Sequence, residues 1–115
     1  MTVKIYHNPR CSKSRETLKL LQERGVEPEV VKYLDTPPGR EELVALLAQL
    51  GLEPRELMRR KEAVYKELGL DAPALTRDQL IQAMLDHPVL IERPIVVSNG
   101  KAALGRPPER VLEVL

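Results

Sequence analysis

The sequence predicts an α/β fold, and the order of its local patterns supports this. Residues 3–6 form a short apolar run, residues 11–24 carry leucines at helical spacing, and residues 29–34 are rich in β-branched and aromatic side chains. After a helical middle section, short apolar runs return around Asn99-Gly100, a strong signal for a two-residue hairpin. A strand, a helix and a strand followed by a hairpin indicate a mixed sheet with helices packed against it.

The helices are predicted from their periodicity and their end signals. We expect the first helix to end at Gly25, because glycine commonly follows a helix in the left-handed conformation. In the middle section, helices are expected over residues 40–50, 55–60 and 62–68, and over a segment that begins at the capping box Thr76-x-x-Gln79.

The last third of the chain supplies the remaining strands. Residues 89–91 and 95–97 are apolar enough for strands, and residues 101–104 would form the strand that returns from the hairpin. Pro107-Pro108 would then open a short terminal helix.

This order of elements is that of a thioredoxin-like fold. We expect a single domain over residues 1–115, with an extra helical insertion over about residues 40–87. A proline placed like Pro94, just before a strand and beside a reactive cysteine, is often cis in this fold. The sequence alone leaves the isomer open.

The composition excludes several classes of protein. Lys and Arg total 18 against 17 Asp and Glu, and only three aromatic residues occur, so a nucleic-acid surface is not expected. No apolar run approaches the roughly 20 residues of a membrane span, and no signal pattern is present at the N-terminus. We therefore expect a cytoplasmic monomer that binds neither a membrane nor a nucleic acid directly.

Cys11 is the only cysteine, and its surroundings favour a reactive thiolate. It lies where a strand hands over to the first turn of a helix, so free backbone N–H groups and the helix dipole favour an anion there. His7, Arg10, Lys13 and Arg15 add positive charge nearby, and polar neighbours on both sides argue against burial. We expect its pKa to fall below the free value of roughly 8.5.

A single cysteine also limits the chemistry. Ser14 takes the fourth position of a Cys-x-x-Cys pattern, so an internal dithiol cycle is excluded and a second thiol must come from another molecule. Thr17 breaks the Cys-x5-Arg signature of phosphate-ester hydrolases. No group of His, Asp and Glu has metal-ligand spacing, so no metal is expected.

Three arginines are candidates for an oxyanion site. Arg93 stands between an apolar run and Pro94, Arg106 stands where the chain leaves the hairpin, and Arg59 begins a basic run. Arginine is suited to bidentate capture of tetrahedral oxyanions. His7 could pair with the thiolate or hold its loop by hydrogen bonds, and a solvent-facing loop position remains equally open.

Seven segments spread over nearly the whole chain match one enzyme family. They are His7-Asn8-Pro9-x-Cys11, Tyr33-Leu34-x-Thr36-Pro37-Pro38, Arg55-x-Leu57-x-Arg59, Tyr65-x-Glu67-Leu68-Gly69-Leu70, His87-Pro88, Arg93-Pro94-Ile95-Val96-Val97 and Arg106-Pro107. In these segments the chain resembles the ArsC-type arsenate reductases, which are glutaredoxin-linked enzymes on a thioredoxin (glutaredoxin-like) fold. It is similar to a short ArsC-like subgroup, since well-studied members carry Gly-Thr-Ser after the cysteine.

The resemblance implies an activity and a set of site residues. It implies that Cys11 attacks arsenate, that Arg59, Arg93 and Arg106 bind the oxyanion, and that His7 helps to lower the cysteine pKa. Ser14 and Pro94 would support this site. The resemblance further implies no bound cofactor, glutathione as a co-substrate, and glutaredoxin as the partner that resolves the mixed intermediate.

Two other functions agree with the same residues. One is a different glutathione-dependent monothiol oxidoreductase. The other is a non-enzymatic redox sensor or RNA-polymerase-binding regulator, although such regulators usually carry the Cys-x-x-Cys that Ser14 breaks.

Overall fold

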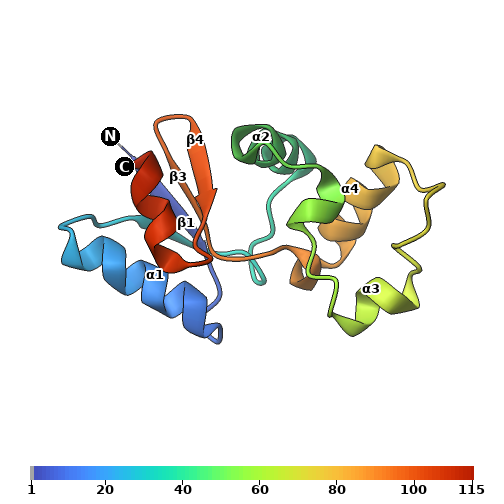
Figure 1. Cartoon of the computed structure of the whole chain (residues 1–115), viewed down its shortest axis with the longest axis horizontal. Coiled ribbons are helices and arrows are strands. Elements are labelled where there is room, and N and C mark those ends of the chain that lie inside the picture. Colours follow the sequence, from blue (N-terminus) through green and yellow to red (C-terminus); the bar gives the residue numbers. More distant parts are fainter. Residues whose placement is uncertain (1) are drawn as a thin grey trace. The chain divides into compact units, whose positions relative to one another are not determined.

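The computed structural model describes residues 2–115, and the chain divides into two compact units. The first unit takes the chain up to Thr36 and again from Arg93 to Leu115, and the second takes Pro37–Glu92 (Figure 1). The helical insertion predicted over about residues 40–87 lies within the second unit. That the whole chain acts as a single domain stays a prediction.

The first unit is built on a four-stranded mixed sheet in the order β2-β1-β3-β4. Strand β1 pairs in parallel with β2 and antiparallel with β3, and β3 pairs antiparallel with β4. Its elements are β1 (Val3–His7), α1 (Ser12–Glu23), β2 (Glu29–Lys32), β3 (Ile95–Ser98), β4 (Lys101–Leu104) and the 3-10 helix η3 (Pro108–Val114). The predicted α/β class and the thioredoxin-like order of elements are confirmed.

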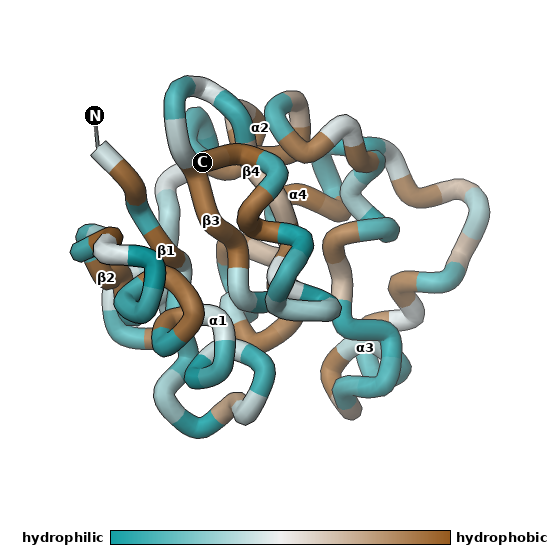
Figure 2. Tube along the Cα trace, turned by 60° about the vertical axis from the view of Figure 1, so that its left-hand side comes forward, coloured by the Kyte–Doolittle hydropathy of each residue, from teal (hydrophilic) through white to brown (hydrophobic). Residues whose placement is uncertain are grey.

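The core of the first unit fixes α1 against the sheet. Ile5 of β1, Leu21 of α1, Val96 of β3 and Val111 of η3 belong to one cluster and are fully buried. Figure 2 shows β3 as largely hydrophobic, whereas β1 alternates between hydrophobic and hydrophilic residues. Burying each such side chain contributes about 1.5–3 kcal/mol. The start of α1 is thereby held just beyond the carboxyl end of β1, where the cysteine loop lies.

The hairpin between β3 and β4 forms at the predicted residues. Asn99 and Gly100 both have positive φ, 55° and 75°, as a type I′ turn requires. Ile95 pairs with Leu104 in the resulting register. The chain segments before β3 and after β4 therefore meet at the same end of the hairpin.

The second unit is helical. It contains α2 (Arg40–Leu50), η1 (Pro54–Leu57), α3 (Ala63–Glu67), α4 (Arg77–Asp86) and η2 (Pro88–Leu90). Helices α2 and α4 contact each other, and Leu47 and Ile81 are among their buried residues. The capping box is confirmed, because Thr76 Oγ1 accepts from the Gln79 N–H at 3.2 Å and Gln79 Oε1 accepts from the Thr76 N–H at 2.8 Å.

The prediction of a strand at residues 89–91 was wrong. Pro88 starts a 3-10 turn there, and the Leu90 N–H donates to the His87 carbonyl. Only Ile91 has strand-like pairing, in an isolated bridge with Met58. A proline at the first helical position outweighed the β-branched composition.

Several other predicted elements are shorter or of another type. The strand predicted over 29–34 ends at Lys32, because the N–H groups of Asp35 and Thr36 both donate to the Lys32 carbonyl and close a turn. The helix predicted over 55–60 is the 3-10 turn η1, and the terminal helix is also 3-10.

Among residues 2–115, no helix has the length and apolar character needed to cross a membrane.

Candidate active site

Cys11 occupies the N-cap position of α1. Its backbone is extended, with φ −95° and ψ 123°, and its N–H donates to the Asn8 carbonyl at 3.0 Å. The residue is only 9% exposed, so the expectation that its polar neighbours would keep it from burial was wrong. The neighbours Arg10, Ser12 and Lys13 are exposed, so their polar groups reach solvent while Cys11 itself is buried.

The pKa of the Cys11 thiol is lowered, as the sequence predicted, although the charged partner is a different residue. Burial raises this pKa, but a hydrogen bond from the Ser14 N–H, the charge of Arg93, a hydrogen bond from the Lys13 N–H and one from the Arg93 side chain together lower it more. Cys11 makes no side-chain cap hydrogen bond of regular geometry, but its N-cap position puts the thiolate at the end of the helix where N–H groups and the helix dipole favour an anion. Arg93, which is remote in sequence, supplies the positive charge.

His7 holds the cysteine loop through Ser14. The Nδ1 atom of His7 lies 2.6 Å from Ser14 Oγ, which also accepts from the Asn8 N–H at 3.0 Å. Both His7 and Ser14 are buried, at 6% and 0% exposure. Burial, followed by the charges of Lys32 and Arg15, lowers the pKa of His7, so the imidazole is neutral at pH 7.

The loop cations identified in the sequence have other contacts. Arg15 Nη1 donates to the Pro9 carbonyl at 2.9 Å, and Lys13 forms an ion pair with Glu16 at 3.6 Å. Arg10 is exposed, and its N–H donates to Asn8 Oδ1. These contacts fasten the loop and the first turn of α1.

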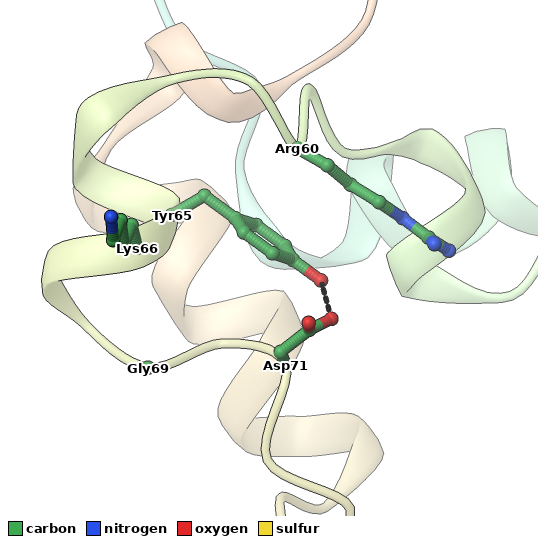
Figure 3. A pocket seen from close by; sticks show the side chains of 5 residues that line it. All are labelled: Arg60, Tyr65, Lys66, Gly69 and Asp71. Carbon is green, nitrogen blue, oxygen red and sulfur yellow. Dashed lines mark hydrogen bonds between the residues drawn. The ribbon is translucent and has the colours of Figure 1, made fainter.

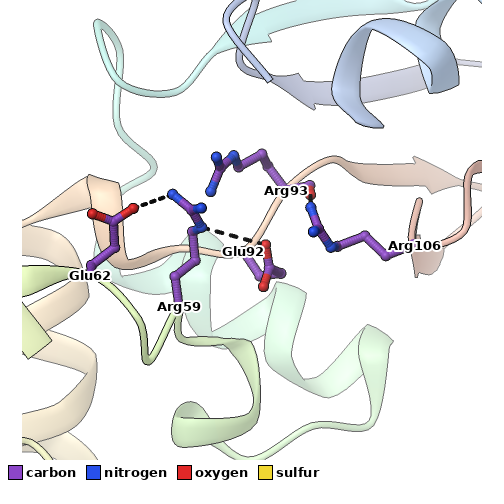
Figure 4. A network of polar contacts seen from close by, with 5 residues as sticks. All are labelled: Arg59, Glu62, Glu92, Arg93 and Arg106. Atoms are coloured by element: carbon purple, nitrogen blue, oxygen red, sulfur yellow. Dashed lines mark hydrogen bonds and ion pairs between the residues drawn. The ribbon is translucent and has the colours of Figure 1, made fainter. Parts of the chain in front are cut away.

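Arg93 and Arg106 are brought together by the β3–β4 hairpin. Arg106 Nη1 donates to the Arg93 carbonyl at 3.2 Å (Figure 4), and both residues precede a cis proline, at Pro94 and Pro107. Arg93 is 8% exposed, whereas Arg106 is exposed. Cys11, His7, Ser14, Arg93, Pro94 and Arg106 thus all belong to the first unit.

Gly105 and Thr17 are structural residues of this site that the sequence did not reveal. A Cβ atom on Gly105 would lie 2.5 Å from Thr17 Oγ1 and 2.7 Å from Pro94 Cγ. The Gly105 N–H also donates to the Pro94 carbonyl at 2.9 Å. Gly105 is therefore required for close packing beside Arg106.

Arg59 lies in the second unit, between two carboxylates. Its Nη1 atom bonds to Glu62 Oε1, and its Nε atom lies 3.7 Å from Glu92 Oε1 (Figure 4). The predicted grouping of Arg59 with the arginines of the first unit stays a prediction.

Two cavities lie beside these segments. In the first unit, a cavity of about 290 Å³ is lined by the cysteine loop and by the turn after β2, with Arg10, Lys32, Leu34 and Asp35 among its residues. In the second unit, a cavity of about 430 Å³ lies beside the hydrogen bond of 2.8 Å between Tyr65 and Asp71 (Figure 3). No His, Cys, Asp and Glu side chains within residues 2–115 gather in a group of three that could hold a metal ion.

Comparison with known proteins gives a consistent result. The model of the ArsC family matches residues 6–114. "Uncharacterized protein YfgD" of Escherichia coli K12 is 65% identical over 98% of this chain and 96% of its own length. "Arsenate reductase" of Neisseria meningitidis serogroup A is 60% identical over 98% of this chain and 97% of its own length.

A solved structure agrees with these relatives. "Arsenate reductase from Vibrio cholerae" has a TM-score of 0.98 and 61% identity, and it covers 100% of this chain and 98% of its own. The cysteine loop, Arg93 and Arg106 lie within the segment that the family model matches. This chain belongs to the ArsC family.

Proposed function

We propose that this protein is an arsenate reductase that uses Cys11 as its nucleophile. The observation that carries the proposal is the lowered pKa of a single cysteine, held by two helix N–H groups and by Arg93. Relatives named arsenate reductase match the chain over nearly its full length, as described above.

The first step uses the thiolate directly. The Cys11 sulfur attacks arsenic, an S–As bond forms, and one As–O bond breaks as its oxygen takes a proton and leaves as water. Arg93, Arg106 and Arg59 would bind the remaining oxygens, because guanidinium groups match tetrahedral oxyanions. The position of Arg106 against the Arg93 carbonyl supports a paired arrangement of the first two.

The second step requires a thiol from outside the chain. When glutathione attacks the adduct, an S–S bond forms to Cys11, the S–As bond breaks, and its electron pair stays on arsenic, which leaves as arsenite. A thiol of glutaredoxin then attacks the glutathione sulfur of the mixed disulfide, which frees the Cys11 thiolate, and a second glutathione releases this glutathione from glutaredoxin as a disulfide. Two thiols are oxidised to one disulfide for each arsenate reduced. This chemistry belongs in a reducing compartment, which for this protein would be the cytoplasm.

His7 and Ser14 would act as positioning residues in this scheme. A neutral imidazole adds no charge to the thiolate, but its contact with Ser14 Oγ fixes the residue whose N–H bonds the thiolate. The conformation of the loop then keeps the sulfur ready for attack.

The cavity beside the cysteine loop is a candidate position for the thiol co-substrate. Its lining includes the cations Arg10 and Lys32 and the anion Asp35, and Arg10 directly precedes Cys11 in the sequence. The γ-glutamyl end of glutathione carries one carboxylate and one ammonium group, and such a pair complements these charges.

This proposal is tested by measuring arsenite formation with different thiol reductants. Arsenite formation should require glutathione with glutaredoxin and should stall with thioredoxin alone, because no internal cysteine can resolve the adduct. Mass spectrometry of protein quenched during turnover should show glutathione on Cys11. A full rate with thioredoxin alone and no adduct would overturn the glutathione-linked mechanism. Failure with every reductant would favour another monothiol reaction or a regulator.

A further inference from the structure

Backbone hydrogen bonds, as well as side-chain contacts, hold Arg59 in place. The Arg59 N–H donates to the Leu90 carbonyl at 2.7 Å, and the Glu92 N–H donates to the Leu57 carbonyl at 2.8 Å. These bonds flank the bridge between Met58 and Ile91. The backbone of Arg59 and that of Glu92 are therefore fixed side by side within the second unit.

Two carboxylates lie beside the guanidinium of Arg59 on this frame. One guanidinium faces two carboxylates, those of Glu62 and Glu92, and the three side chains are 27%, 27% and 23% exposed. The contact with Glu62 is a direct hydrogen bond, whereas the nearest oxygen of Glu92 lies 3.7 Å from Arg59 Nε. Glu62 alone can orient Arg59 through its hydrogen bond, and Glu92 places a second carboxylate at ion-pair distance from the same guanidinium.

A second carboxylate is unfavourable for an arginine that must bind a bare anion. A carboxylate only accepts hydrogen bonds, so it repels an oxyanion that has no proton. An oxyanion that still carries an O–H can instead donate this hydrogen to the carboxylate, in a short and strong charged hydrogen bond. Glu92 can therefore distinguish anions by their protonation.

We propose that Glu92 makes the oxyanion site selective for tetrahedral anions that keep a hydroxyl group, such as arsenate and phosphate, against sulfate. Glu62 orients Arg59, and Glu92 accepts the O–H of the bound anion. This inference rests on the proposed function, in which Arg59 binds the oxyanion. Glu92 also precedes Arg93 directly in the chain, so it adjoins the arginine that bonds the thiolate.

The test compares two anions that differ by one hydrogen. At pH 8 phosphate and sulfate both carry about two negative charges, but only phosphate retains an O–H, so their affinities separate hydrogen bonding from charge. Both dissociation constants are measured by titration calorimetry for the wild type, for Glu92→Gln and for Glu67→Gln. Glu67 is an exposed residue of α3, and its substitution removes the same charge from the second unit.

We expect Glu92→Gln to shift the preference toward sulfate by about tenfold, because one charged hydrogen bond to phosphate is lost and a repulsion of sulfate is removed. Glu67→Gln should leave the ratio unchanged. Equal changes for both anions in Glu92→Gln would overturn the inference and leave Glu92 an orienting role only.

A further variant separates this inference from the proposed function. Arg59→Ala should weaken the binding of both anions; if it weakens neither, Arg59 is not part of the oxyanion site and the inference falls with it. Because anion binding requires no turnover, a selectivity change in Glu92→Gln without any arsenate reduction would contradict the proposed function alone.

Discussion

Arg106 donates a hydrogen bond to the carbonyl of Arg93, 3.2 Å away, across the open end of the β3–β4 hairpin. The two residues are 13 positions apart in the chain, and the type I′ turn at Asn99-Gly100 brings them together. The charge and a side-chain hydrogen bond of Arg93 in turn lower the pKa of Cys11, so the hairpin links the conformation of Arg106 to the proposed nucleophile.

Replacing Arg93 by Ala should raise the pKa of Cys11, because the thiolate loses both a positive charge and a hydrogen bond. Arg93→Lys should raise it less, since a charge is retained. The rate of iodoacetamide alkylation measured against pH reports the pKa. An unchanged midpoint in a folded Arg93→Ala protein would show that the N–H groups of α1 alone stabilise the thiolate.

Replacing Ser14 by Ala should destabilise the fold by about 1–3 kcal/mol, because the partly buried Asn8 N–H and the buried His7 ring would each lose a partner. Denaturant unfolding measures this effect. Ser12→Ala, in the exposed first position of α1, is the matched control and should change stability little. Equal effects from the two substitutions would contradict the positioning role of Ser14.

His7 should make stability depend on pH in a defined direction. Its pKa is lowered in the folded state from the ordinary 6.5, so the unfolded chain takes up a proton that the folded chain does not. The stability that the fold gains from a neutral His7 is fully present above pH 6.5. It is lost as the pH falls from 6.5 through the lowered pKa of the folded state. Urea unfolding from pH 7.5 to 5 should therefore show a smaller loss of stability in His7→Gln than in the wild type, with His87→Gln as the control. Parallel pH curves for the wild type and His7→Gln would contradict this prediction.

Replacing Gly105 by Ala should cost about 1–3 kcal/mol of stability, because the new Cβ meets Thr17 and Pro94 at 2.5 and 2.7 Å. Since Arg106 is the next residue, arsenate affinity should also fall. Adding Thr17→Ala removes the closest contact and should restore part of the stability. If the double variant were no more stable than Gly105→Ala, the clash with Thr17 would not be the cause.

Replacing Lys32 by Ala should raise the KM for glutathione several-fold and leave the KM for arsenate unchanged, if the cavity beside the cysteine loop holds the thiol. Lys19→Ala, which removes an exposed charge from α1, is the control. A change in the arsenate KM alone would place Lys32 in the oxyanion site instead.

The sequence predicted the elements whose patterns are local. The periodicity of α1 and α2, the capping box at Thr76 and the hairpin at Asn99-Gly100 depend on neighbouring residues, and all were confirmed. The strand predicted at 89–91 failed because Pro88 started a 3-10 turn.

Contacts between residues distant in sequence could not be predicted in the same way. The sequence placed Cys11 at a helix start and predicted a lowered pKa, but it attributed the charge to loop neighbours rather than to Arg93. Gly105 packs against Thr17, which lies 88 positions earlier in the sequence, and no local pattern signals such a contact. The carboxylates around Arg59 likewise depend on the pairing of Met58 with Ile91.

The most direct measurement is the arsenite produced in the presence of glutathione and glutaredoxin, compared between the wild type and Cys11→Ser. We predict steady arsenite formation by the wild type and none above background by Cys11→Ser, with both proteins folded and both binding phosphate. Arsenite formation by Cys11→Ser at the wild-type rate would contradict the assignment of Cys11 as the nucleophile.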